Sequence, residues 1–358
     1  MENKQFFYEN LETVLTYMEP SCRFNLALKI PSIRKAEKDV PLHIDRLELY
    51  DNRLVINKTE YCMRVWRKCQ SNVGLYNGEV DDDLGKYGSK INVDETIEPG
   101  DIKLGDRGSV LSSRWPNYEC PEQRAEWLQH DCPMYSLPCK KRYSLPCQHF
   151  IRLYVIRNIP MVRCTKSIAR STSMYQFPYA SMKIYQLMKR LLTIFFGNRR
   201  GEWTVGTMSF KNNVLRWPVH TRKPIVREFD IGEYTKLKMN ILNSIINLCV
   251  PLNNLQMTVP SSHDRIADHP MFLHADHVTI SNQPTEDVFS DLFSFQAHTV
   301  VIANPPSTHF FDFESALFVF MEEIRPIGVR WSILTYAKKD LTILRLPDVF
   351  DVLGKSSE

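Results

Sequence analysis

Long apolar runs are missing from this chain of 358 residues. The longest strictly apolar run, Ala316–Met321, is far shorter than the roughly 20 residues that span a bilayer. An apolar leader segment is missing as well, because Glu2, Lys4 and Glu9 stand where a signal peptide would place it. We therefore expect a soluble intracellular protein, cytoplasmic or nuclear, that has no membrane partner.

Closely spaced cysteine pairs of the Cys-x-x-Cys type are also lacking. The nine cysteines are an odd number spread over a long chain, whereas disulfide scaffolds are short chains with even counts. The densest group is Cys132, Cys139 and Cys147 with His149, and zinc modules usually pair their ligands on a tighter knuckle. We expect free thiols and no metal site.

Common catalytic and nucleotide-binding motifs do not occur in the sequence. It contains no Gly-x-Ser-x-Gly elbow, no phosphate-binding loop and no Gly-x-Gly-x-x-Gly turn. His263, His269, His274 and His277 crowd among aspartates, yet they supply only part of a hydrolytic ligand set. We expect no catalytic residue and no cofactor, with a metallohydrolase as a third alternative.

The start of the chain has the pattern of short helices. Leu11, Val14, Leu15 and Met18 follow the i, i+3, i+4, i+7 spacing of one helix face. This spacing predicts a helix that ends before Pro20, because proline interrupts helical hydrogen bonding.

A second and a third helix are predicted before residue 40. Ser21 can cap a helix that carries Phe24 and Leu28, and Pro31 ends it and opens a further short turn. Three short helices bury little apolar surface by themselves. Residues 1–40 therefore need either the rest of the chain or a partner to cover their apolar face.

The apolar period changes to two in residues 41–70. Leu42, Ile44 and Leu54 belong to this alternation, which is interrupted at Asp51-Asn52 and predicts a small antiparallel meander. Residues 71–130 lose the pattern and contain glycines spaced through acidic, polar sequence. We interpret them as a long loop or a partly disordered insertion.

Residues 176–350 regain order and contain a weak repeat. Four units share one apolar spacing, and their starts are separated by 23, 22 and 29 residues. Each unit resembles the strand of a leucine-rich repeat. The units are Leu252-x-x-Leu255-x-Met257, Ala275-x-x-Val278-x-Ile280, Ala297-x-x-Val300-x-Ile302 and Pro326-x-x-Val329-x-Trp331.

Helical periodicity lies beside these units. Ile184, Leu187, Met188, Leu191 and Phe195 predict one helix that ends at Gly197-Asn198, and Leu237, Ile241, Ile245 and Leu248 predict another. Strands that alternate with helices imply a mostly parallel sheet. The predicted fold class is thus α+β or α/β, with a helical start, an antiparallel meander and a C-terminal strand–helix domain that is leucine-rich-repeat-like. An open α/β sheet without solenoid curvature is the alternative for that last domain.

Acidic residues are absent between Cys132 and Gly201, a stretch with thirteen basic residues in a chain of net charge +4. We expect residues 131–175 to form a basic extended arm followed by a strand. Such segregation of charge attracts an acidic partner or nucleic acid, unless the nine acids between Glu79 and Arg107 neutralise it internally. The predicted basic patch consists of Lys140, Lys141, Arg142, Arg152, Arg157 and Arg163.

Three stretches, Leu11–Lys35, Val40–Leu49 and Leu54–Tyr61, resemble the opening of a domain of unknown function that is expanded in Caenorhabditis nematodes. Phe313–Thr335 resembles its final helix–strand unit. The opening helices are similar to an F-box, which docks a Skp-type adaptor of a cullin ubiquitin ligase while a following repeat domain holds the substrate. The positions that match the F-box pattern are Leu11, Val14, Leu15, Pro20, Phe24, Leu28 and Pro31.

The resemblance implies a protein-interaction module that has an F-box-like N-terminus and recruits a protein substrate. The alternative is a protein that uses the basic 132–201 segment to bind an acidic partner or nucleic acid. Phosphate contacts would make the second kind of binding strongly salt-dependent.

Overall fold

The computed structural model describes residues 3–69, 78–80, 83, 96–104, 147–160, 168–178, 183–212, 214–218, 221–259, 272, 275–281, 299–303, 330–336 and 341–345. Within these ranges the chain is a mixed α+β protein, as predicted. It divides into two compact units, of which unit 1 holds residues 1–202 and 211–222 and unit 2 holds residues 203–210 and 223–358. None of the described helices has both the length and the apolar character that crossing a bilayer demands.

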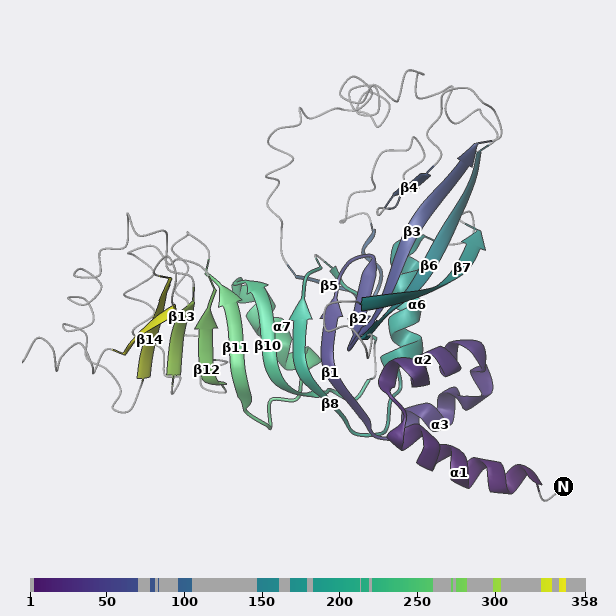
Figure 1. Cartoon of the computed structure of the whole chain (residues 1–358), viewed down its shortest axis with the longest axis horizontal. Coiled ribbons are helices and arrows are strands. Elements are labelled where there is room, and N and C mark those ends of the chain that lie inside the picture. The colour runs from purple at the N-terminus through teal and green to yellow at the C-terminus, as the bar shows by residue number, and fades with distance from the viewer. Residues whose placement is uncertain are drawn as a thin grey trace, which may run out of the picture. The chain divides into compact units, whose positions relative to one another are not determined.

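Unit 1 begins with the predicted short helices, which Figure 1 shows in purple. They are α1 (Asn3–Tyr17), α2 (Pro20–Lys29), the 3-10 turn η1 (Pro31–Ile33) and α3 (Arg34–Asp39). The predicted cap of α2 was wrong. Glu19 caps this helix instead of Ser21, because the Glu19 carboxylate accepts a hydrogen bond from the Cys22 N–H at 3.1 Å.

The predicted meander follows directly. Strands β1 (Leu42–Leu49), β2 (Arg53–Ile56) and β3 (Thr59–Cys69) pair antiparallel in this order. A second turn lies at Asn57, whose φ of 53° is one that asparagine tolerates better than most residues. The Asn57 side chain stabilises this turn by accepting hydrogen bonds from the backbone N–H groups of Asp45 and Arg46.

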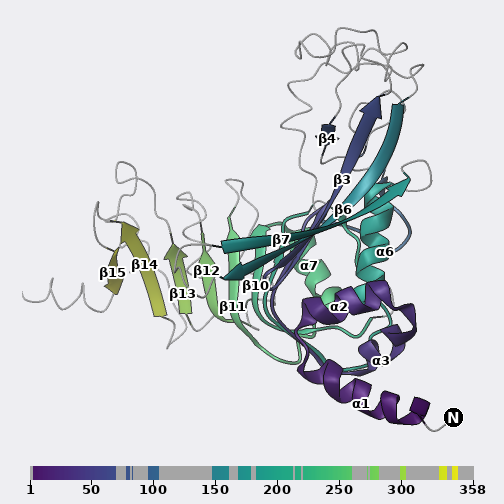
Figure 2. The ribbon, with the colours of Figure 1, turned by 45° about the vertical axis from the view of Figure 1, so that its right-hand side comes forward.

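Two long strands extend the meander sheet. Strand β6 (Cys147–Pro160) pairs antiparallel with β3, and β7 (Ile168–Pro178) pairs antiparallel with β6, so the three form a long ribbon (Figure 2). The short strand β4 (Gly78–Val80) also pairs with β3. A separate pair joins β5 (Ile102–Lys103) to β9 (Val214–Leu215). Of the predicted insertion 71–130, the structure therefore describes two short strands and their surroundings, and its other residues lie outside the described ranges.

The core of unit 1 is aromatic. Helix α6 (Ile184–Phe196) ends at Gly197 as predicted and buries Phe195 and Phe196. The Phe24 ring of α2 stacks on Phe195 with centroids 4.4 Å apart, and Tyr61 of β3 meets Phe195 edge-on at 5.2 Å. These contacts join the N-terminal helices, the meander and α6 in one core.

Unit 2 is a sheet whose strands follow one another in chain order. Strands β8 (Trp203–Phe210), β10 (Ile225–Glu233), β11 (Leu252–Thr258), β12 (Ala275–Ile280), β13 (Thr299–Ala303) and β14 (Arg330–Tyr336) are parallel. Strand β15 (Leu341–Arg345) closes the order antiparallel to β14. Helix α7 (Lys236–Ile245) connects β10 to β11. The predicted mostly parallel sheet is therefore present.

The register corrects one unit of the predicted repeat. Leu255, Val278 and Val300 lie on neighbouring strands in register, as their common spacing predicted. Val300 then pairs with Trp331 and not with Val329, so the predicted fourth unit begins two residues too early in the sequence. A shift of two residues keeps the same face of the strand, which is why the pattern still looked plausible.

The buried face of α7 was predicted correctly at Ile245 but not at Leu237. Leu237 was expected on the buried face, but its side chain is 48% exposed. The buried side chains are Met239, Leu242 and Ile245. Helix α7 ends at Ile245, so Leu248 does not belong to it. Two further segments whose apolar spacing predicts helices, Val288–Phe295 and Phe313–Ile324, lie outside the described residues.

Candidate functional site

Two rows that are polar at every position except Val301 cross the parallel strands of unit 2. Each row contains one residue of each of these six strands, because the strands are in register. We call these two rows the polar strand face. The first row is Thr207, Glu228, Asn254, His277, Thr299 and Arg330, and the second is Ser209, Asp230, Gln256, Thr279, Val301 and Ser332.

Side chains of the polar strand face bond to one another across strands. Thr207 Oγ1 donates to Glu228 Oε2 at 3.1 Å, and Thr279 Oγ1 donates to Asn254 Oδ1 at 2.9 Å. Glu228, His277 and Arg330 are exposed. The first row is therefore an ordered, solvent-facing line of hydrogen-bonding groups, acidic at β10 and basic at β14.

The opposite face of the same strands is apolar and buried. Met208, Phe229, Leu255 and Val278 occupy one register row on this face, and each is at most 1% exposed. Parallel sheets are usually covered on both faces, so a parallel sheet with exposed polar residues on one face is unusual.

The predicted adaptor-binding residues divide into buried and exposed positions. Leu15 packs on Ala36 and Val40, and Phe24 lies in the aromatic core, so both contribute to folding. Pro20 is buried too, whereas Leu11 and Leu28 are half-buried and Pro31 is exposed. Val14 is 52% exposed, and Tyr17, one turn further along α1, is 87% exposed. Among the described side chains of α1, the exposed large apolar ones are therefore Val14 and Tyr17, and sequence reasoning missed Tyr17.

A buried charge cluster fastens the N-terminal helices to α6. Glu37 of α3 accepts hydrogen bonds from Arg199 at 2.6 Å and forms an ion pair with Arg23 at 3.1 Å. All three side chains are at most 2% exposed. Burial lowers the pKa of the Arg23 guanidinium, and the nearby Glu37 carboxylate opposes that shift. The cluster therefore has a structural role, because its three charged side chains are all buried.

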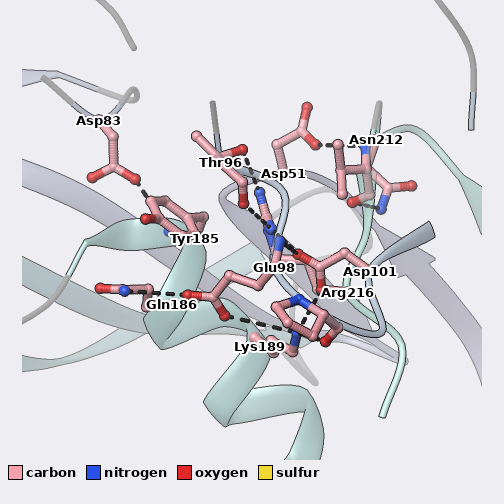
Figure 3. A network of polar contacts seen from close by, with 12 residues as sticks. Asp51, Asp83, Thr96, Glu98, Asp101, Tyr185, Gln186, Lys189, Asn212 and Arg216 are labelled. Carbon is pink, nitrogen blue, oxygen red and sulfur yellow. Dashed lines mark hydrogen bonds and ion pairs between the residues drawn. The ribbon is translucent and has the colours of Figure 1, made fainter. Parts of the chain in front are cut away.

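A second polar network attaches part of the acidic insertion to α6 (Figure 3). Arg216 donates to Asp101 Oδ2 at 2.6 Å and to the Thr96 hydroxyl at 2.9 Å. Lys189 of α6 pairs with the other Asp101 oxygen at 2.9 Å and donates to the Pro99 carbonyl at 2.7 Å. Asp101 therefore joins two cations that are far apart in the sequence.

The amino end of α6 is part of this network. The Asp83 carboxylate accepts hydrogen bonds from the backbone N–H groups of Ile184 and Tyr185 at 2.8 and 3.1 Å, where the helix dipole favours an anion. Burial raises the pKa of the Tyr185 hydroxyl, and the carboxylates of Glu98 and Asp83 add to the shift. Acids of the insertion thus neutralise Lys189 of the basic segment, as the internal-pairing alternative supposed.

The predicted basic patch is described only in part. Arg152 and Arg157 lie on β6, with the Arg152 guanidinium 4.1 Å above the centre of the Trp66 ring. Lys140, Lys141, Arg142 and Arg163 lie outside the described residues. Of the histidine cluster, His277 lies on the polar strand face, and His263, His269 and His274 fall outside the described ranges. No group of three or more metal-ligating side chains occurs among the described residues.

Comparison with protein families finds a match over part of the chain. A family model described as a domain of unknown function, DUF3557, matches residues 183–335. The chain contains this domain. It runs from the start of α6 to β14, and includes Phe313–Thr335, one of the stretches that carried the resemblance. No curated protein and no solved structure matches the chain. The F-box likeness and the nematode expansion stay predictions.

Two further units of the repeat were not recognised in the sequence. Val205-x-x-Met208-x-Phe210 on β8 and Val226-x-x-Phe229-x-Ile231 on β10 have the same apolar spacing as the later units. They also align with them in register, since Met208 pairs with Phe229 and Phe229 with Leu255. A search for this spacing upstream of Leu252 would have found both.

Proposed function

We propose that this chain is a protein-interaction module that binds a protein partner on the polar strand face of unit 2. The observation that carries the proposal is the polar face of a parallel sheet, which exposes Glu228, His277 and Arg330 while the other face is buried. Stacked strand units of the leucine-rich-repeat type use such a surface, because each strand adds side chains at a fixed spacing to one extended binding face.

The arrangement of charges supports a protein as the partner. The first row contains an acidic residue, amide and hydroxyl groups, an imidazole and a basic residue, from Glu228 to Arg330. A row of mixed sign offers hydrogen bonds and ion pairs to an equally mixed protein surface. It would repel part of any uniformly charged polymer, which argues against nucleic acid at this face.

A protein that recruits a substrate must also bind its adaptor, and the N-terminal helices fit this second interaction. We propose that α1 contacts a Skp-type adaptor through Val14 and Tyr17, which lie three residues apart on one helix face. In this proposal the buried F-box-like positions Leu15, Pro20 and Phe24 shape the helices, and the exposed ones bind. The partner on the polar strand face would then be the substrate of a cullin ubiquitin ligase.

The polar strand face is tested by changing its exposed charges. The double variant Glu228→Lys/His277→Asp alters two exposed side chains of the first row, and Lys236→Glu alters an exposed charge on α7. A protein captured by the full chain from a cell lysate is identified, purified and titrated by calorimetry against each form. We expect the double variant to bind about tenfold more weakly, and Lys236→Glu to bind like the wild type. Equal affinity of all three forms for every captured protein would refute the proposal.

The adaptor contact is tested separately with purified Skp-type adaptor. Val14→Asp/Tyr17→Asp should abolish binding to the full chain without unfolding it, because both side chains are exposed. Thr16→Asp adds a charge to another face of α1 and should bind normally. Leu15→Asp is unsuitable, since Leu15 is fully buried and a charge there unfolds the helices. If the wild-type chain binds no adaptor, the ligase role is wrong, while the polar strand face keeps its own test.

A further inference from the structure

Strand β7 is an edge strand in the described part of unit 1. It pairs with β6 over its whole length, from Ile168 opposite Pro160 to Pro178 opposite Phe150, and with no other described strand. Its other side therefore carries a row of backbone N–H and C=O groups that an added strand could bond. Met174 is 51% and Phe177 36% exposed, so side chains on both faces of β7 reach solvent.

The usual protection of an edge strand is missing from β7. Natural edges are blunted by lysines, inward charges, prolines, bulges or short length. Strand β7 is 11 residues long, continues in register without a bulge, and has its single proline at the last position. An unprotected edge of this length is a site for strand addition by another chain.

The charge beside this edge is of one sign. Strands β6 and β7 contain Arg152, Arg157 and Arg170 and no Asp or Glu. Arg152 leans toward the edge strand, because its Nε donates to the side-chain oxygen of Gln176 on β7 at 3.4 Å. The pairing of Arg157 with Ser171 puts a second arginine one strand from the edge. An added strand would meet a field that favours carboxylates.

We propose that β7 accepts an extended, acidic segment of a partner protein as an additional strand. The segment gains backbone hydrogen bonds from the edge and ion pairs from the arginines. The acidic insertion of this chain is a poorer candidate for the added strand, since its residues Asp83, Glu98 and Asp101 already contact α6 and Arg216. A second copy would bring two acid-free strands together, and nucleic acid has no peptide groups to complete the ladder.

Peptide binding to the wild-type full chain gives the first test. The probe is a fluorescein-labelled peptide of alternating glutamate and threonine, about ten residues long to cover β7, followed by fluorescence anisotropy. Its lysine–threonine analogue and a single-stranded oligothymidylate of similar length are the competitors. We expect the acidic peptide to bind at least about tenfold more tightly than either. Equal or tighter binding of the oligothymidylate would overturn the proposal in favour of nucleic acid.

Backbone methylation of the peptide tests strand addition without altering the protein. Two acidic peptides are compared, one N-methylated at alternate residues and one at every residue. A strand bonds the edge through every second residue, so the first peptide should bind and the second should not. Equal binding of both would show that charge alone attracts the peptide, and the proposal would be wrong.

Variants of the chain locate the site. Ser173→Pro and Met174→Pro remove adjacent N–H groups, which point to opposite sides of β7, so one variant should stay folded by circular dichroism and lose binding. Arg152→Gln/Arg157→Gln should weaken binding about tenfold, and Arg190→Gln on an exposed part of α6 should not. Wild-type affinity in the folded proline variant would refute the site. A dimer by light scattering that this variant disrupts would assign the edge to a second copy and overturn the acidic partner.

Discussion

Unit 1 and unit 2 join distant parts of the chain in different ways. Unit 1 depends on a few buried polar contacts between residues far apart in sequence, such as Glu37 with Arg199 and Thr96 with Arg216. Unit 2 depends on neighbouring strands whose apolar residues repeat in register, such as Leu255 beside Val278. The first arrangement is specific but sensitive to single changes, and the second distributes stability over many similar contacts.

This difference also determines which surfaces are available for binding. In unit 1 the charges of Arg199, Lys189 and Arg216 are satisfied by carboxylates inside the unit. In unit 2 the polar residues occupy a strand face that the apolar core does not need. These charged residues of unit 1 are therefore structural, whereas Glu228, His277 and Arg330 of unit 2 are exposed to a partner.

The largest effect is expected from Glu37→Gln, which leaves Arg23 and Arg199 buried without their counter-ion. We expect a loss of about 3–5 kcal/mol in the free energy of unfolding, as when one partner of a buried ion pair is removed. Urea denaturation followed by circular dichroism measures it. Asp39→Asn on the exposed end of α3 is the matched control and should change little. A loss below about 1 kcal/mol in Glu37→Gln would contradict a structural role for the buried cluster.

In unit 2, Leu255→Ala should cost about 2–5 kcal/mol, because the side chain is fully buried between the neighbouring strands. Asn253→Ala, an exposed change near the start of the same strand, should cost less than about 0.5 kcal/mol. The same denaturation experiment compares the two. Similar losses in both variants would mean that Leu255 contributes no more to stability than an exposed residue of β11.

A smaller effect is expected from Arg216→Met, which leaves Thr96 and Asp101 without their buried donor. We expect a loss of about 1–3 kcal/mol, together with faster amide hydrogen exchange in residues 96–104. Arg190→Gln, an exposed change on α6, is the control. Unchanged exchange in that segment would show that Arg216 does not hold it.

Helices and strands that have a clear apolar period were predicted well. The i, i+3, i+4 spacing around Leu15 located α1, the alternation after Leu42 located the meander, and the helix from Ile184 ended at Gly197 as expected. Such patterns follow from local geometry, since helices repeat every 3.6 residues and strands every two. The errors arose where the period alone is ambiguous, as at the fourth repeat unit and the face of α7.

Contacts between distant residues could not be predicted from pattern. Nothing near Glu37 in the sequence distinguishes it from the exposed acids around it, and Arg199 belongs to the acid-free stretch for which both internal pairing and an external partner are compatible with the sequence. Their pairing needs the approach of α3 to the end of α6, where Gly201 has no room for a side chain because a Cβ would lie 2.6 Å from the Val40 carbonyl oxygen. Asp101 was likewise one of nine acids in an insertion without pattern.

The sequence by itself determined the N-terminal helices, the meander, helix α6 and three of the apolar repeat units, because each depends on neighbouring residues or on residue type. Tertiary structure alone decided which charged side chains are buried in ion pairs and which remain at a surface. Solvation and pairing of a charge depend on what packs beside it, and for Glu37 and Arg199 that neighbour is 162 residues away.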